Sequence, residues 1–338
     1  MTFQDSLGRV SAGETLARDE MSAVIDHVMH GRAAAAEIAL LLTALHERGE
    51  TVDEIAGAAD ALRRHMTPVR TARKGLVDTC GTGGDGSATF NISTAAAIVA
   101  AAAGVPVAKH GNRSITSRTG SADVLAELGV KVDAAVVVVE RCLDELGIGF
   151  CFAPHLHPAM RHVSAVRKEL GFPTIFNLLG PLCNPAGAPY QVLGVGKPGL
   201  HDRMAAALAA LGAERAVLVR GDDGLDEVTL GGGTRVLYVD PAGVREFAWS
   251  PGDFGLQFAW REAMLVDSPA ESAAVIRRVL AGEQGPCRDV VVLNAAAALW
   301  TAGHERAQVD CAAAAAAAID SGAASDLLAK WAALSQRS

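Results

Sequence analysis

Apolar residues in the first seventy positions recur at the three-to-four spacing of helices that face a core. The clearest run extends from Leu16 to Met29, and Gly31 follows it as a suitable helix stop. The same spacing returns over Ala34–Arg48 and Val52–Met66, and Pro68 closes the block. We therefore expect a small domain composed of helices only.

From Leu76 onward, short β-branched runs alternate with alanine-rich helical stretches. The candidate strands are Leu76–Cys80, Val105–Lys109, Ile148–Phe152, Gln191–Val195, Ala216–Val219 and Arg235–Val239. The candidate helices between and after them are Ser93–Ala103, Ala122–Leu128, Val136–Leu146, Leu200–Leu211, Pro269–Leu280, Asp289–Trp300 and Cys311–Ser335. This alternation predicts an α/β domain with a mostly parallel central sheet.

Composition narrows the class of protein. A chain of 338 residues can bury a large core, and its net charge of -8 without a basic stripe argues against nucleic-acid binding. The six cysteines are scattered, which is typical of reduced thiols in a cytosolic protein. The first residues form neither a basic nor an apolar targeting segment, and the apolar run Ala95–Val107 is shorter than the ~20 residues of a membrane span. A cytoplasmic enzyme that does not bind membranes is the expectation.

The first candidate strand leads into a loop rich in glycine and hydroxyl groups, Gly81–Thr89. Asn91-Ile92-Ser93-Thr94 then opens a helix. Glycines allow backbone N–H groups to turn inward, and a helix N-terminus adds partial positive charge. The loop is neither a Walker A nor a G-x-G-x-x-G motif, and a simple tight turn is the alternative. We expect a phosphate or pyrophosphate site here.

The second candidate strand ends in another polar loop, Lys109–Ser117, followed by Gly120–Asp123. A lysine, an arginine and several hydroxyls directly after a strand suit a second anion site. Ser121 and Asp123 could equally cap the next helix, and the whole segment could be a solvated loop.

The third candidate strand leads into Ala153–Pro158, and the following helix contains Arg167. The pair His155 and His157 could suggest zinc, but no cysteine or carboxylate is suitably spaced. Arg167 can pair with a carboxylate, so a pocket for an aromatic acid is favoured, with a surface arginine as the alternative.

The fifth candidate strand leads into an acidic turn, Gly221–Glu227, with four carboxylates in a short stretch. Such a cluster would repel itself unless it is neutralised. Because Mg²⁺ binds to one or two carboxylates together with substrate phosphates, a magnesium site is favoured over a solvated turn.

Together these motifs resemble the anthranilate phosphoribosyltransferase family. The matching segments are Gly81–Asp85, Asn91–Ala95, Lys109–Arg113, Gly120–Leu125, His157–Met160, Val166–Gly171, Phe176–Pro185 and Asp223–Glu227. They occur in the family's order over nearly the whole chain. The resemblance implies transfer of the phosphoribosyl group of phosphoribosyl pyrophosphate (PRPP) to the amine of anthranilate in tryptophan biosynthesis, with Mg²⁺ as cofactor.

The resemblance also implies an organisation and a set of site residues. A helical domain (residues 1–70, rejoined by about 157–182) is hinged to an α/β PRPP-binding domain (71–338), and the chain forms a homodimer. The implied PRPP-binding residues are Gly81, Gly84, Asp85, Thr89, Asn91, Ile92, Ser93, Thr94, Lys109, His110, Gly111, Asn112, Arg113, Ser114, Ile115, Thr116, Ser117 and Ser121. Those implied for anthranilate are Gly81, Asn112, Pro154, His157 and Arg167, and those for the metal are Ser93, Asp226 and Glu227. No general base is assigned.

Two positions depart from the family pattern, and three rival functions remain. Thr116 stands where many members have serine, and Pro173 stands where many have arginine, which removes a cation near the substrate helix. The rivals are a pyrimidine nucleoside phosphorylase, a paralogue that uses another acceptor or binds nucleic acid, and a non-catalytic PRPP-binding regulator. The acidic cluster at Asp226 and Glu227 argues against the first and the third.

Overall fold

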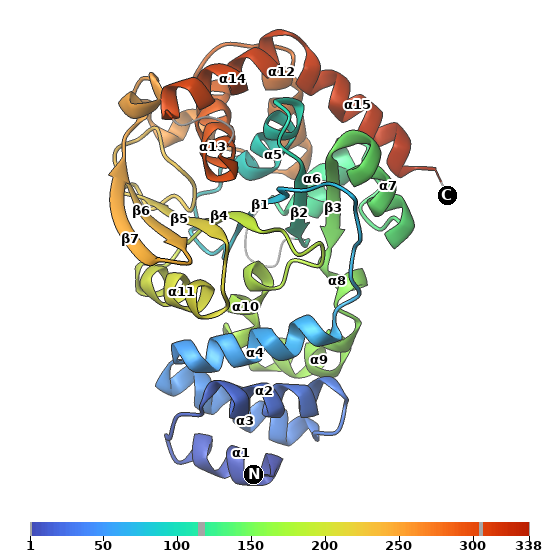
Figure 1. Cartoon of the computed structure of the whole chain (residues 1–338), viewed down its shortest axis with the longest axis vertical. Coiled ribbons are helices and arrows are strands. Elements are labelled where there is room, and N and C mark those ends of the chain that lie inside the picture. The colour runs from blue at the N-terminus through green and yellow to red at the C-terminus, as the bar shows by residue number, and fades with distance from the viewer. Residues whose placement is uncertain (1, 114–118, 304–306, 338) are drawn as a thin grey trace.

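The structure is a computed structural model that describes residues 2–113, 119–303 and 307–337. Four helices open the chain: α1 (Phe3–Ser11), α2 (Arg18–Met29), α3 (Ala35–Arg48) and α4 (Val52–His65). Thr2 and Thr51 start α1 and α4 with capping boxes, in which each hydroxyl accepts from the third backbone N–H of its helix. The helices bury the apolar stripe predicted from the sequence, including Met21, Ile25 and Leu41. They form the lower part of the molecule (Figure 1).

A seven-stranded sheet lies at the centre of the larger part, with the order β3-β2-β1-β4-β5-β6-β7. The strands are β1 (Val77–Gly81), β2 (Val107–Gly111), β3 (Ile148–Phe152), β4 (Tyr190–Gly194), β5 (Arg215–Gly221), β6 (Thr234–Asp240) and β7 (Gly243–Trp249). The first five are parallel, and β6 and β7 are antiparallel. Gly81 is paired with Gly194, and Gly111 with Phe152, so the carboxyl ends of the four adjacent strands β3, β2, β1 and β4 are level. Loops that follow these strands emerge at one edge.

Helices cover both faces of the sheet. The described helices that follow β1 in the chain, not all of which lie on the sheet, are α5 (Ile92–Ala102), α6 (Ser121–Glu127), α7 (Val136–Leu146), α8 (Ala153–Leu156), α9 (Arg161–Leu170), α10 (Ile175–Leu179), α11 (Pro198–Ala210), α12 (Pro269–Leu280), α13 (Pro286–Ala302), α14 (Gln308–Asp320) and α15 (Ala323–Ser335). Short 3₁₀ turns occur at Pro158–Met160, Gly180–Leu182, Pro251–Phe254 and Arg261–Met264. Val217 and Val219 face the core of α5 and α13, whereas Ala216 and Leu218 face the core shared with α4 and α11. This alternation is the two-residue period of a strand buried on both sides.

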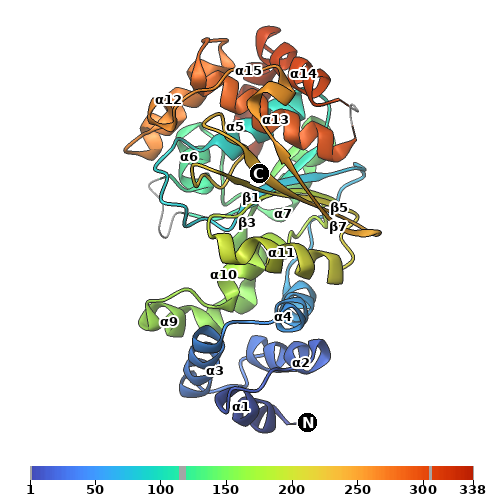
Figure 2. The same ribbon diagram turned by 90° about the vertical axis from the view of Figure 1, so that its left-hand side faces the viewer.

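The segment containing α9 and α10 leaves the sheet and packs against the N-terminal helices. Helix α9 contacts α2 and α3, and α10 contacts α3 and α4. Both views place α9 beside α4, at the same level, and α10 between α4 and the sheet (Figures 1 and 2). The residues after β3 therefore connect the two parts of the molecule.

The predicted fold class is confirmed: helices come first, and a larger α/β part with a mostly parallel sheet follows. Three details differ. Helix α1 was not singled out because its buried apolar contribution is limited to Leu7 and Val10. Strand β7 was missed because it is largely exposed, so its pattern resembles a loop. The predicted helix Cys311–Ser335 is two helices, because Gly322 adopts a φ of +79° at the break.

All six cysteines lie within the described residues, and none forms a disulfide. Cys142, Cys151, Cys183 and Cys311 are buried as small apolar groups. In residues 2–113, 119–303 and 307–337, no single helix is long and apolar enough to cross a membrane. Helices α14 and α15, which are bent by 65° relative to each other, are together long and apolar enough for a span, but only by length and composition.

Candidate active site

The loop after β1 has the backbone that its glycines predict. Gly83, Gly84 and Gly86 adopt φ values of +65°, +80° and +68°, in the left-handed region that glycine tolerates. A side chain at Gly84 would meet open space, so this backbone is accessible. The far end of the loop is anchored to the chain before α12, where the Phe90 N–H donates to the Met264 carbonyl at 3.0 Å. The loop is thus curled, held at its end and open at its middle.

Helix α5 begins directly behind this loop. The Asn91 side chain caps it by accepting from the Thr94 N–H at 3.1 Å. Asn91 is itself held by the Thr119 carbonyl at 2.9 Å and the Ser272 hydroxyl at 2.9 Å. A fixed N-terminus of an 11-residue helix next to exposed loop amides is a favourable environment for a phosphate group.

Three carboxylates, Asp85, Asp226 and Glu227, meet at the same edge of the sheet. Burial, together with repulsion from Asp85 and Glu227, raises the pKa of Asp226 well above its usual range. Burial also raises the pKa of Glu227 to about 7, although Lys109 opposes the shift. One oxygen of Asp85 is buried without a hydrogen-bond partner in the described part of the chain. This concentration of negative charge suits a cation.

Lys109 lies beneath the cluster and does not project into solvent. Only 2% of the residue is exposed, and its ammonium donates to the Thr79 carbonyl and, at 3.1 Å, to the Ser93 hydroxyl. Burial lowers the pKa of Lys109, while the nearby carboxylates of Asp78 and Glu227 oppose the shift. Lys109 therefore balances the charge of the acidic cluster from below.

Gly194 ends β4 and Gly196 follows it; both let the acidic turn and the glycine loop come close to this strand, and sequence reasoning did not single them out. A Cβ atom on Gly194 would lie 1.7 Å from the Asp226 carbonyl oxygen. One on Gly196 would lie 2.7 Å from the Gly83 carbonyl oxygen and 2.9 Å from the Asp85 nitrogen. The available signal was the pair of glycines at the end of the fourth candidate strand, Gly194 within it and Gly196 directly after it. Asn294 of α13 was also missed; it holds the acidic turn by accepting from the Val228 N–H at 2.9 Å.

The loop after β2 is described up to Arg113, and the predicted residues Ser114, Ile115, Thr116 and Ser117 lie outside the described residues. Gly111 is required by close packing, since a Cβ atom there would lie 2.3 Å from the Ser121 hydroxyl. That hydroxyl donates to the Asn112 carbonyl at 3.3 Å. Arg113 is exposed and pairs with Asp123 at 2.8 Å. Gly111, Asn112 and Ser121 thus lie together at the end of β2.

His110 and His157 form a buried pair between β2 and the segment after α8. Their Nε2 atoms are 3.1 Å apart, and His110 Nδ1 lies 2.9 Å from the Gly180 carbonyl. Burial, with repulsion from the other imidazole, lowers the pKa of His110 to about 3, and burial lowers that of His157 to about 4. Both rings are neutral at physiological pH, with His110 donating through Nδ1 and accepting from His157. Pro154 is exposed in the neighbouring α8.

Arg167 comes from α9, on the side of the N-terminal helices. Its guanidinium lies 5.6 Å from the centre of the Phe176 ring and donates to the Asn177 side chain at 3.2 Å. Burial lowers the pKa of Arg167, yet none of the described carboxylates forms an ion pair with it. Pro173 is exposed before Thr174, whose capping box with Asn177 starts α10.

The fold and the site define a two-part glycosyl transferase. Residues 4–66 match the model described as glycosyl transferase family, helical bundle domain, and residues 73–325 match the one described as glycosyl transferase family, a/b domain. A relative named anthranilate phosphoribosyltransferase, from Anaeromyxobacter sp. (strain Fw109-5), is 51% identical over 335 residues, covering 99% of each chain. The chain therefore belongs to the anthranilate phosphoribosyltransferase family.

Solved structures of this family have the same fold. The anthranilate phosphoribosyltransferase from Thermus thermophilus superposes with a TM-score of 0.92 at 46% identity, covering 98% of this chain and all of that one. The enzyme from Saccharomyces cerevisiae in complex with PRPP and Mg gives a TM-score of 0.90 at 28% identity, covering 98% and 97% of the two chains. The likeness extends over both parts of the molecule.

Proposed function

We infer that this chain transfers the phosphoribosyl group of PRPP to the amine of anthranilate, giving N-(5-phosphoribosyl)anthranilate and pyrophosphate in tryptophan biosynthesis. Family membership supports the reaction class. The observation that carries the proposal is the convergence of Asp85, Asp226 and Glu227 beside the glycine loop and the N-terminus of α5. The pyrophosphate of PRPP needs backbone N–H donors, and a cation bound between the pyrophosphate and the three carboxylates would relieve the repulsion between these negative charges.

The residues present fit Mg²⁺, because crowded, half-buried carboxylates with raised pKa values and an unpartnered Asp85 oxygen are suitable ligands. Asp226, Glu227 and the Ser93 hydroxyl would hold the ion, and when bound it supplies positive charge to the pyrophosphate. The amides from Gly81 to Asp85 and the start of α5 bind the phosphates. The full PRPP-binding set proposed from the resemblance is retained, with Lys109 acting through charge balance and not through direct contact.

Anthranilate is proposed to enter over the ends of β1, β2 and β3, where Gly81, Asn112 and Pro154 lie. Arg167 would orient its carboxylate, and the neutral pair of His157 with His110 would shape the polar wall. In the reaction the ribose C1–O bond to pyrophosphate breaks, the C1–N bond to the amine forms, and the amine proton leaves to solvent. This chemistry asks the protein for position and charge, so no covalent nucleophile is needed.

The domain organisation belongs to the same proposal. Residues 1–70 with about 157–182 would move as a helical domain against the α/β domain (71–338), and closure would exclude water from PRPP. We also propose a homodimer in the cytoplasm. Light scattering of the purified chain tests the dimer, with a mass of one chain as the contradicting result.

The decisive experiment follows anthranilate fluorescence in the purified protein. Fluorescence should fall only when both PRPP and Mg²⁺ are present. Asp226→Asn should lower kcat/KM about 10²-fold or more, because charge stabilisation at a departing group is worth several kcal/mol. Asp222→Asn, in the same turn but exposed, is the matched control and should retain activity. A folded protein without this activity would contradict the proposal, and phosphorolysis of a nucleoside would indicate the phosphorylase instead.

A further inference from the structure

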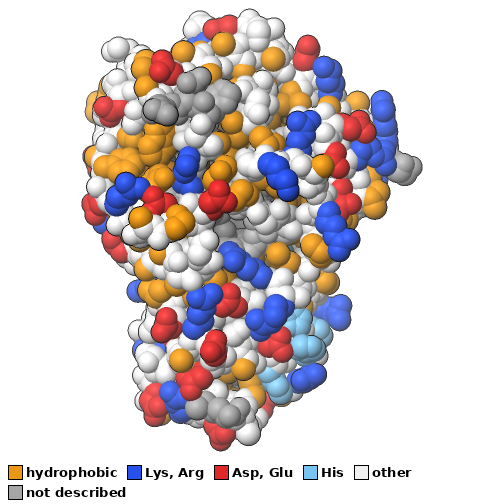
Figure 3. All heavy atoms as spheres, viewed as in Figure 1, with side chains coloured by type: hydrophobic (Ala, Val, Ile, Leu, Met, Phe, Trp, Pro, Cys, Tyr) orange, Lys and Arg blue, Asp and Glu red, His pale blue; other side chains and the backbone are white. Residues whose placement is uncertain are grey.

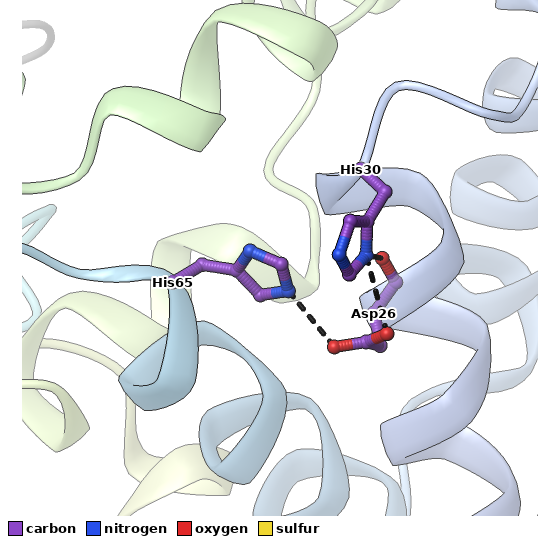
Figure 4. Close-up of side chains that lie close together, drawn as sticks. All are labelled: Asp26, His30 and His65. Atoms are coloured by element: carbon purple, nitrogen blue, oxygen red, sulfur yellow. Dashed lines mark hydrogen bonds and ion pairs between the residues drawn. The ribbon is translucent and has the colours of Figure 1, made fainter.

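A cluster of two imidazoles and a carboxylate lies in the helical part, away from the site described above. Asp26 and His30 are one turn apart on and just after α2, and His65 ends α4 (Figure 4). Figure 3 shows histidine side chains gathered on the surface of this part of the molecule. The family reaction has no use for these three residues, since they belong to neither the glycine loop nor the acidic turn.

The three side chains point toward one another. His65 Nε2 lies 2.8 Å from one carboxylate oxygen of Asp26. His30 Nδ1 lies 3.2 Å from the other carboxylate oxygen and 2.8 Å from the Asp26 backbone carbonyl. The two rings meet edge to face with their centres 4.6 Å apart. One potential ligand atom from each residue lies within 4.8 Å of the others. Ligand atoms bound at about 2.0–2.2 Å to a single ion are at most about 4.4 Å apart, so the three side chains would have to close slightly around the ion.

The packing of the helices partly covers Asp26 and His65 and leaves the His30 side of the cluster open to solvent. His65 is 17% exposed and Asp26 is 32% exposed, whereas His30 is 42% exposed and forms the open side. Helices α2 and α4 pack against each other along their length, so the two elements that supply the ligands are already docked. Burial raises the pKa of Asp26, but the hydrogen bond from His65 and the charge of His30 outweigh it and keep the carboxylate ionised.

We propose that Asp26, His30 and His65 form a binding site for a divalent transition-metal ion of the zinc class. Two imidazoles and one carboxylate are the ligand set that zinc, cobalt and nickel favour, whereas Mg²⁺ prefers oxygen ligands alone. Metal binding would replace the contacts that now tie both rings to Asp26, and the His30 ring would give up its hydrogen bond to the Asp26 backbone carbonyl in order to bind through Nδ1. Water completes the coordination on the exposed side.

The charged neighbour of the site is Arg64. Its guanidinium lies 3.6 Å from the same Asp26 oxygen that His65 contacts, and it donates to the Ser22 hydroxyl at 3.0 Å. This positive charge weakens the attraction of a cation. Because the Arg64 side chain is 53% exposed, it can turn toward solvent when the ion binds. Arg64→Gln should therefore tighten metal binding, which a merely structural histidine cluster would not predict.

The site has a structural consequence. His65 directly precedes the connection to the sheet, in which the Thr67 N–H donates to the Leu156 carbonyl at 2.8 Å and the Val69 N–H donates to the Pro185 carbonyl at 3.0 Å. A bound ion joins α2 to the end of α4 at that point. Binding to the folded chain should thus raise its melting temperature.

The test uses the full chain without an affinity tag, titrated with Zn²⁺ by calorimetry and with Co²⁺ by visible absorption. Saturating Mg²⁺ is kept in the buffer so that the acidic cluster at Asp226 and Glu227 is occupied. We expect one Zn²⁺ per chain, a Co²⁺ spectrum of low coordination number with nitrogen ligands, and a higher melting temperature with Zn²⁺. The double variant His30→Gln, His65→Gln should weaken binding at least about tenfold and abolish the thermal shift.

His27→Gln is the matched control. His27 lies on the same helix but stacks on Phe3, with ring centres 4.4 Å apart, so its loss should leave zinc binding unchanged. Unfolding of each variant without metal is measured first, and Asp26→Asn, which keeps the shape of the side chain, provides a second test. The proposal is overturned if the wild-type chain binds no Zn²⁺ in the presence of Mg²⁺. It is equally overturned if the double variant binds as tightly as the wild type.

Discussion

Replacing Glu227 by glutamine should stabilise the metal-free protein at alkaline pH while it abolishes activity. The structure raises the pKa of this carboxyl from 4.5 to about 7, chiefly through burial. A change of that size, at about 1.4 kcal/mol per pH unit, corresponds to about 3 kcal/mol. The pKa of about 7 already includes the opposing attraction between the Glu227 carboxylate and the Lys109 ammonium. Ser93 donates a hydrogen bond to the Glu227 carboxyl, and glutamine keeps an oxygen that can accept it while removing the charge.

The pH window follows from the direction of the shift. Below pH 4.5 the carboxyl is protonated in both the folded and the unfolded chain, so the substitution has little effect there. Between 4.5 and 7 the unfolded chain loses the proton first, and the wild-type protein loses stability as pH rises. Well above pH 7 the variant should have its full advantage of about 3 kcal/mol in the free energy of unfolding over the wild-type protein. The variant should therefore gain stability at about pH 8 and little at about pH 4.5.

The assay is thermal unfolding without metal or PRPP at both pH values. An entropy of unfolding of about 2.1 cal/mol/K per residue gives ~0.7 kcal/mol/K for 338 residues, so about 3 kcal/mol shifts the melting temperature by about 4 °C. Asp222→Asn, which removes an exposed charge from the same turn, should leave the melting temperature nearly unchanged. An equal gain at both pH values, or none at the alkaline one, would refute the reasoning that Glu227 is held in a charged, crowded site.

Three further substitutions test the site and its support. Gly196→Ala places a methyl group 2.7 Å from the Gly83 carbonyl oxygen and should raise the KM for PRPP about tenfold or more, whereas Gly199→Ala, with nothing within 4 Å, should not. Arg167→Gln should raise the KM for anthranilate about 10- to 100-fold and leave that for PRPP unchanged, as steady-state kinetics will show. Glu54→Ala removes a fully buried carboxylate paired with an arginine of α3 and should destabilise the chain by about 3–5 kcal/mol in urea unfolding; a smaller loss would mean that water compensates the arginine.

Local pattern was sufficient to predict the backbone of the glycine loop and the cap of the helix that follows it. Glycines followed by Asn91 at a helix start predicted a phosphate-binding turn, because backbone conformation and capping depend on near neighbours in the chain. The acidic turn at Asp226 and Glu227 was evident for the same reason. The site residues themselves stay predictions until a ligand is observed.

Several roles were not predictable because they depend on residues far apart in sequence. Lys109 was predicted to bind PRPP; only the folded chain shows that its ammonium donates to the Ser93 hydroxyl and lies close enough to Glu227 to balance its charge. Gly194 is needed only because the Asp226 backbone comes to lie against it. The pairing of His110 with His157 required β2 and the segment after α8 to meet.

The sequence by itself determined the helical N-terminal block, the α/β alternation and the turned backbone of the glycine loop, because periodicity, propensity and turn preference act over a few neighbouring residues. The tertiary structure decided the pairing of β7 at an exposed edge, the break at Gly322 and the charge balance around Asp226. It also brought His30 and His65 to either side of Asp26. These features depend on the burial and contact of distant segments, and those energies exist only once the chain has folded.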